Sequence, residues 1–237
     1  MIPALGTFVR IELELPELVF HRAVARAISR IQKLEKLLSV FDSESEISLL
    51  NRTSPKRYLK LSLETLEVLK FSAELQNDSN RAFCIGNHLS FRDDEVRKEN
   101  EESIDLGGIA KGYAVDQAWD ELMLTANEAG IKEVFGSVNA GGDLKINERK
   151  IVEIKIESAI GKYFSHPMKR GALASSSRRF REGASAVYSP RMEPKRQMVS
   201  IEAKSAWLAD GLTKVALFQS DPFPCLKKWN AELIYEA

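Results

Sequence analysis

The sequence predicts an α+β fold in a single domain spanning residues 1–237. Helical patterns dominate the first half of the chain, whereas short strand patterns follow one another in the second half. This segregation distinguishes α+β proteins from α/β proteins, in which strands and helices alternate regularly. With 237 residues, 44% of them hydrophobic, the chain is also long enough to bury a substantial core.

The first half contains two helical patterns, each preceded by a strand. Residues 7–13 alternate as a strand, and 18–40 carry apolar side chains at helical spacing with basic residues between them. The apolar positions of that helix are Ala23, Ala27, Ile31, Leu34 and Leu38. A short strand at 58–61 precedes a second helix, for which Ser62 is the predicted N-cap. The highly charged residues 91–103 are expected to form an exposed hairpin or loop.

The second half begins with a helix and is then rich in strands. The helical pattern covers 109–129 and is closed by Gly130, and a late helix is expected at 205–219. Strands are expected between these helices at 132–139, 143–147, 151–157, 171–175, 185–189 and 197–203. Their close succession predicts antiparallel pairing, with the helices on one side of the sheet.

Composition excludes several classes of function. Lys and Arg total 34, as do Asp and Glu, so the chain lacks the basic field of a nucleic-acid-binding protein. No apolar run approaches the ~20 residues of a transmembrane helix, and the N-terminus carries no leader-like pattern, so we expect a cytoplasmic protein. Cys84 and Cys225 are too far apart in sequence to suggest a CxxC or zinc motif.

Two glycine-rich segments are the strongest functional signal. They are residues 104–116, IDLGGIAKGYAVD, and residues 137–144, SVNAGGDL. Glycines let the backbone turn sharply or approach a ligand closely, and the N–H groups at the start of the predicted helix 109–129 could receive a phosphate. Neither segment matches G-x-G-x-x-G or the P-loop pattern, so the commonest phosphate motifs are excluded. The simpler alternative is that these glycines only form turns.

The two segments resemble the signatures of the ApbE-type flavin transferases, L-D-L-G-G-I-A-K-G-Y-A-V-D and V-N-x-G-G-D. Further similarities follow in the expected order: Gly6-Thr7, residues 41–51 (FDSESEISLLN) and residues 209–212 (ADGL). Together these motifs extend over roughly residues 5–218. The resemblance implies a duplicated, T-fold-like arrangement of antiparallel sheets and packed helices.

Members of this family transfer FMN from FAD to a Thr or Ser hydroxyl of an acceptor flavoprotein, and AMP leaves. The resemblance therefore implies FAD as the small-molecule substrate and a protein partner. The positions that it assigns to FAD binding are Leu5, Phe41, Ala82, Asp105, Ile109, Lys111, Asp116, Asn139, Gly141, Gly142 and Ser176.

The resemblance also implies Mg²⁺, bound by the carbonyl of Ala110, by Asp210 and by a hydroxyl four positions further on. Lys214 stands at that last position, and the neighbouring Thr213, the candidate third ligand, lies about 100° away around a helix. One hypothesis is that the Lys214 ammonium pairs with Asp210 and occupies the place of the metal. The alternative is an ordinary surface pair, worth a few tenths of a kcal/mol.

A second departure affects the general base. Residues 186–190 read AVYSP where the family has H-[IV]-I-D-P, so Ala186 and Ser189 replace the catalytic His and its Asp neighbour. Asp143 and Tyr188 are the candidate replacements as proton acceptors.

Of the three histidines, His21 is expected to be a solvated or packed residue of the first helix and His166 a loop residue, whereas the sequence around His88 indicates no role. In residues 80–84, NRAFC, Arg81 replaces a family glycine, as a phosphate contact or an ordinary loop residue.

These departures leave two alternatives to an FMN transferase. The first is a non-catalytic flavin-binding protein of the same fold that has lost the catalytic His and a metal ligand. The second is an FAD pyrophosphatase, in which water replaces the acceptor hydroxyl.

Overall fold

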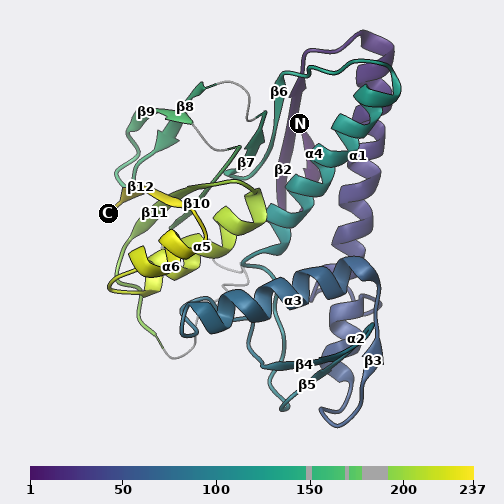
Figure 1. The fold of residues 1–237 in the computed structure, drawn as a ribbon, viewed down its shortest axis with the longest axis vertical. Coiled ribbons are helices and arrows are strands. Elements are labelled where there is room, and N and C mark those ends of the chain that lie inside the picture. Colours follow the sequence, from purple (N-terminus) through teal and green to yellow (C-terminus); the bar gives the residue numbers. More distant parts are fainter. Residues whose placement is uncertain (148–150, 169–170, 178–191) are drawn as a thin grey trace.

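A seven-stranded antiparallel sheet is the largest element of the computed structural model, which describes residues 1–147, 151–168, 171–177 and 192–237 (Figure 1). Its strand order is β1-β2-β6-β7-β10-β11-β12. The strands are β1 (Ile2–Ala4), β2 (Thr7–Leu13), β6 (Gly136–Ala140), β7 (Asp143–Ile146), β10 (Ala172–Ser177), β11 (Met198–Ala203) and β12 (Glu232–Glu236). The sheet thus contains strands from both ends of the chain, and the first strand, β1, and the last, β12, form its opposite edges.

The two faces of this sheet are covered differently. Helix α4 (Ala110–Glu128) packs on β6 and β7, α5 (Ala206–Phe218) packs on β10 and β11, and α1 (Glu17–Leu38) lies alongside α4 (Figure 1). A separate hairpin, β8 (Val152–Glu157) and β9 (Tyr163–Met168), packs on the other face through a small apolar cluster. That cluster contains Ile146, Ile156, Met168 and Leu173.

The segment between α1 and α4 forms the lower part of the molecule in Figure 1. It contains α2 (Glu46–Arg52), α3 (Leu63–Asp78) and a small sheet. The sheet has the order β3-β5-β4 and is formed by β3 (Leu59–Lys60), β5 (Glu95–Lys98) and β4 (Leu89–Arg92). The apolar side chains of this segment and those of α5 form one core. Helix α6 (Phe223–Lys228), which precedes β12 in the chain, packs at the edge of that core.

The predicted α+β class is confirmed, as are most of the longer elements. Strand β2 has the predicted bounds, and Ser62 caps α3 by accepting a hydrogen bond from Thr65 N. A hairpin at 89–98 overlaps the exposed hairpin or loop expected at 91–103, but Val96 and Lys98 in it are buried. The strand predicted at 132–139 begins only at Gly136, and β1, α2, β9, α6 and β12 were not predicted. The strand predicted at 185–189 lies outside the described residues.

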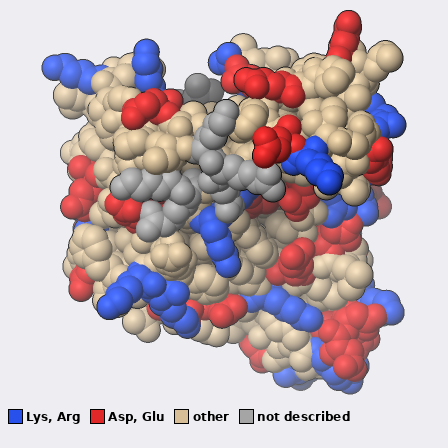
Figure 2. Space-filling view, turned by 45° about the horizontal axis from the view of Figure 1, so that its top comes forward, with Lys and Arg blue, Asp and Glu red and all other residues tan. Residues whose placement is uncertain are grey.

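The surface agrees with the balanced composition. On the face shown in Figure 2, acidic and basic side chains are interspersed, without an extended field of one sign. Within the described ranges, every helix is too short or too polar to cross a bilayer.

Candidate active site

The loop before α4 is held by a side chain from α2. Asn51 Oδ1 accepts a hydrogen bond from Ile104 N at 2.7 Å, and Asn51 Nδ2 donates to Ile104 O at 2.9 Å. Farther along the loop, Asp105 Oδ1 accepts from Gly107 N at 2.7 Å. These bonds fix the chain as it enters the helix, so the first turn of α4 has a defined position.

Gly112 lets α4 approach α5 more closely than any side chain would allow. A Cβ at this position would lie 2.5 Å from Ala206 O and 2.6 Å from Trp207 Cα, both of them backbone atoms of α5. The absence of a Cβ also brings Gly112 N within 3.4 Å of Asp210 Oδ2. The close crossing therefore places the first turn of α4 beside Asp210.

The second glycine-rich segment forms the tight turn between β6 and β7. Gly141 and Gly142 have φ values of +62° and +107°, which favour glycine. Asn139 Oδ1 closes the turn by accepting a hydrogen bond from Gly142 N at 3.1 Å. Asp143 follows directly, and its side chain is 2% exposed. The turn thus delivers a buried carboxylate to the helix side of the sheet.

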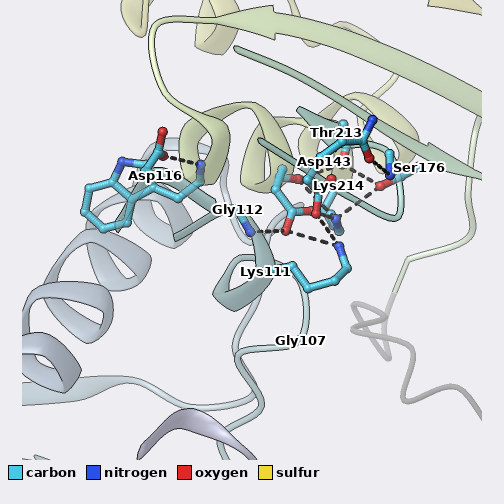
Figure 3. Close-up of polar contacts among 12 residues, drawn as sticks. Gly107, Lys111, Gly112, Asp116, Asp143, Ser176, Thr213 and Lys214 are labelled. Atoms are coloured by element: carbon cyan, nitrogen blue, oxygen red, sulfur yellow. Dashed lines mark hydrogen bonds and ion pairs between the residues drawn. The ribbon is translucent and has the colours of Figure 1, made fainter. Parts of the chain in front are cut away.

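Two lysines and two buried carboxylates meet where α4, α5 and β7 come together (Figure 3). Lys111 Nζ forms an ion pair with Asp143 Oδ2 and lies 3.7 Å from Asp210 Oδ2. Lys214 Nζ pairs with Asp210 Oδ1, lies 3.2 Å from Asp210 O and donates to Ser176 Oγ at 3.1 Å. The Asp210 side chain is only 1% exposed, so the Lys214–Asp210 pair is not an ordinary surface pair.

Burial and charge shift the pKa values of this cluster. Burial, and after it the neighbouring Asp210 carboxylate, raises the pKa of Asp143 to about 6, although Lys111 and Lys214 oppose the shift. Burial alone would lower the pKa of Lys111, but Asp143 and Asp210 outweigh it and raise that pKa. Lys111 therefore stays an ammonium at neutral pH, while Asp143 titrates close to neutrality.

Two clefts flank this cluster. The first, of about 570 Å³, is lined by Leu5, Phe41, Asp105, Ala110 and Lys111 among others. Phe41 is 81% exposed, so its ring is available to cover a flat ligand.

The second cleft, of about 360 Å³, lies between the sheet and the β8–β9 hairpin. Its lining includes Asn139, Gly141, Gly142, Ser176 and Tyr163. Lys111 lines the first cleft, and Ser176, which accepts a hydrogen bond from Lys214, lines the second, so the charged cluster borders both clefts.

Three of the positions assigned to FAD lie away from these clefts. Asp116 Oδ2 accepts a hydrogen bond from Trp207 N at 2.9 Å, and Figure 3 shows this pair apart from the charged cluster. Burial raises the pKa of Asp116 to about 6. Ala82 and Ile109 are 1% and 0% exposed, so their side chains belong to the core. These three residues therefore support the structure around the site and do not line the clefts.

The residues at the position implied for magnesium do not fit that ion. Mg²⁺ requires near-octahedral oxygen ligands at short distances. Here Lys214 pairs with Asp210 Oδ1, and Thr213 Oγ1 donates to Asp210 O at 2.6 Å and lies 2.7 Å from Ser176 Oγ. In the described part of the chain, no three His, Cys, Asp or Glu side chains gather as metal ligands would.

Tyr188, the candidate proton acceptor, and the replacements Ala186 and Ser189 lie outside the described residues.

Two expectations about other side chains are resolved. His166 is in strand β9 and not in a loop, and its Nε2 lies 2.6 Å from Oε2 of the buried Glu202. The adjacent Pro167 is compatible with a strand because β8 and β9 form a two-stranded sheet, in which each strand is an edge.

The second expectation concerns Arg81. It adopts a left-handed backbone conformation, with φ of +67°, at the place of a family glycine. Its Nη1 lies 2.5 Å from His88 Nε2. The Arg81 side chain is thus engaged by a neighbouring loop residue, which supports the structural alternative over a phosphate contact.

One contact at the first cleft was missed. Glu35 Oε1 in α1 accepts a hydrogen bond from Leu5 N at 2.9 Å and lines that cleft. Leu5 has a φ of +57°, so this bond helps to hold an unusual turn at the cleft edge. Local sequence carries no signal for this bond, because Glu35 is one of many polar residues of α1.

A model of the ApbE family matches residues 5–87 and 84–222 of the chain. The chain belongs to the ApbE family. The ApbE protein from Thermotoga maritima has the same fold, with a TM-score of 0.79 and 20% identity over 98% of this chain and 92% of that chain. No curated protein sequence matches the chain.

Two further ApbE structures agree. The flavin transferase ApbE from Vibrio cholerae gives a TM-score of 0.78 with 17% identity over 98% of this chain and 90% of its own. The apo form of the flavinyl transferase ApbE from Pseudomonas stutzeri gives 0.74 with 18% identity over 95% and 90%. The ApbE resemblance of the glycine-rich motifs is therefore confirmed at the level of family and fold.

Proposed function

We propose that the protein is an FAD:protein FMN transferase, which moves FMN from FAD to a Thr or Ser hydroxyl of an acceptor protein and releases AMP. Membership of the ApbE family supports this reaction, as does the similarity in fold to the flavin transferases from Vibrio cholerae and Pseudomonas stutzeri. FAD is then the small-molecule substrate, and the acceptor flavoprotein is the partner.

The observation that carries the proposal is that Lys111 lines the first cleft and belongs to a charged cluster that borders both clefts. A dinucleotide has a flat group at each end and an anionic diphosphate in the middle. Lys111 remains protonated, and its side chain is 31% exposed, so it can pair with that diphosphate. The Gly141–Gly142 turn on the other side offers backbone approach without interfering side chains.

In the reaction, the acceptor oxygen attacks the phosphorus of the FMN moiety and a new P–O bond forms. The P–O bond to AMP breaks, and AMP carries away the bonding electrons. The hydroxyl proton goes to a base, for which Asp143 is the candidate among the described residues. Its pKa of about 6 leaves it ionised at pH 7 to 8 and able to accept a proton. Positioning and charge neutralisation supply most of the rate in such phosphoryl transfers.

A second function is supported by one observation, the replacement of the family's His and Asp at residues 186–190 by AVYSP. A chain without that general base would bind FAD and leave it intact. Loss of a general base typically costs ~10²- to 10⁴-fold in rate. Product analysis distinguishes slow transfer from binding alone.

The test incubates the purified protein with FAD and an acceptor peptide, and follows AMP release together with the mass of the peptide. A peptide heavier by one phosphoester-linked FMN supports the transferase. Bound FAD without AMP supports the flavin-binding alternative, and AMP with free FMN in the absence of peptide supports a pyrophosphatase.

Two variants sharpen this test. Asp143→Asn should lose transfer by ~10²-fold or more because it removes the proton acceptor. It also removes the carboxylate that pairs with Lys111, so FAD affinity is measured separately and the rates are compared at saturating FAD. Asp94→Asn, at an exposed pair with Lys60, is the matched control and should transfer at the rate of the unaltered protein. Equal rates in the two variants would exclude Asp143 as the base.

A further inference from the structure

Lys214 occupies a position that is built like a small cation site. Its ammonium lies against three oxygens of different kinds: Asp210 Oδ1, Asp210 O at 3.2 Å and Ser176 Oγ at 3.1 Å. A lysine ammonium has three N–H donors, so this set matches its hydrogen-bonding capacity. The Lys214 side chain is 14% exposed, which keeps the group in place and partly screened from water.

We propose that Lys214 is a built-in cation that replaces a divalent metal ion, so that this protein binds the diphosphate of FAD without magnesium. The inference rests on the proposed function, because it takes FAD as the ligand. It concerns a different property, namely where the positive charge at the diphosphate comes from. Lys214 supplies charge and orients Asp210, and Lys111 contacts the phosphate.

The charge balance of the cluster supports this assignment. Lys214 supplies one positive charge where a divalent ion would supply two, and together with Lys111 it balances the two negative charges that Asp143 and Asp210 carry when ionised. The cluster is then neutral as it stands. A divalent ion bound to Asp210 would lie next to the Lys214 ammonium, and like charges at such a distance repel each other strongly in a buried site.

The two lysines differ in what they leave accessible. Lys214 is the less exposed, and its donors are directed to protein oxygens. The Lys111 side chain is 31% exposed and lines the first cleft, so it borders the space available to a ligand. This difference assigns the direct phosphate contact to Lys111 and the supporting charge to Lys214.

Ser176 and Thr213 complete the arrangement. Ser176 Oγ contacts both Lys214 Nζ and Thr213 Oγ1, at 3.1 and 2.7 Å. Thr213 in turn donates to Asp210 O. The Thr213 hydroxyl, the candidate metal ligand, is therefore engaged with Asp210 O and Ser176, and Ser176 in turn contacts the ammonium.

The decisive experiment measures FAD binding by calorimetry in two buffers, one with EDTA and one with excess Mg²⁺. The unaltered protein should bind FAD with the same Kd in both buffers, within about twofold. Mg²⁺ that does not distinguish the free protein from the FAD complex cannot shift the binding equilibrium. A Kd that falls more than about tenfold on adding Mg²⁺ overturns the inference and leaves the proposed function standing. No FAD binding in either buffer overturns the proposed function, and the inference with it.

Variants test the role of the residue itself. Lys214→Thr restores a hydroxyl at the fourth position after Asp210 and should make FAD binding weaker by about tenfold or more in EDTA, with recovery in Mg²⁺. Lys214→Met removes the charge without adding a ligand, so Mg²⁺ should not restore its binding. Lys227→Thr, at an exposed lysine of α6, is the control and should behave as the unaltered protein.

Thermal unfolding of each variant separates loss of folding from loss of binding. If both Lys214 variants fold and bind FAD in EDTA as tightly as the unaltered protein, the inference is wrong. If a Lys214 variant does not fold, the comparison of the two buffers with the unaltered protein still decides between the outcomes.

Discussion

The contact between α4 and α5 at Gly112 makes a sharp prediction for Gly112→Ala. The new Cβ would meet Ala206 O at 2.5 Å, Trp207 Cα at 2.6 Å and Ala206 C at 2.7 Å, and all three are backbone atoms. Real Cβ atoms essentially never approach so closely, so one helix must move. Because α4 carries Lys111 and α5 carries Asp210, such a movement also separates the two halves of the charged cluster.

The magnitude follows from two opposing effects. Overpacking a tight interior contact costs about 1–3 kcal/mol, and the upper end applies here because no flexible side chain can yield. Replacing a helical glycine by alanine returns about 1 kcal/mol of helix propensity. The net loss in the free energy of unfolding is therefore about 2 kcal/mol, which corresponds to a fall in Tm of roughly 4–8 °C for a chain of this size.

Gly211→Ala is the matched control. It lies in α5, gains the same propensity, and its Cβ would meet Leu75 Cδ2 at 2.6 Å, the end of a side chain that can rotate away. Its free energy of unfolding should change by less than about 1 kcal/mol. Urea unfolding followed by circular dichroism measures both variants, and FAD titration reports on the site. If the two variants are equally stable, the close backbone crossing is not the reason for glycine at 112.

Two further predictions concern stability. Asn51→Ala leaves Ile104 N and O without their partners and should lower the free energy of unfolding, measured by urea denaturation, by about 2–4 kcal/mol. A loss under about 1 kcal/mol would show that these two hydrogen bonds are not needed to hold the loop. Asp116 has its pKa raised from 3.8 to about 6 by burial, so its contribution to stability is fully present below about pH 4 and is lost as pH rises through about 6. Between pH 4 and 7 the free energy of unfolding of Asp116→Asn should therefore fall by less than that of the unaltered protein, and the difference should reach up to about 3 kcal/mol. Identical pH profiles of unfolding for the two proteins would contradict this reasoning.

Local sequence was sufficient where a physical signal is local. The alternating apolar residues of β2, the N-cap Ser62 and the spacing of apolar residues in α1 each predict an element from neighbouring residues alone. Strand β9 was missed because Pro167 argues against a central strand, and only its place in a two-stranded sheet makes it acceptable. Short elements such as α2 and α6 give too few residues for a periodic pattern.

For the site, the motifs of the sequence predicted the family and some of the residues that line the two clefts, among them Asp105, Lys111 and Asn139. Only the tertiary structure decided what those residues do to one another. Lys111 meets Asp143 and Asp210 from two other elements, and Lys214 meets Ser176 from a neighbouring strand. Ion pairs and burial depend on distances between segments far apart in the chain, and these distances are set by the packing of α4 on α5 and the sheet, which no local pattern encodes.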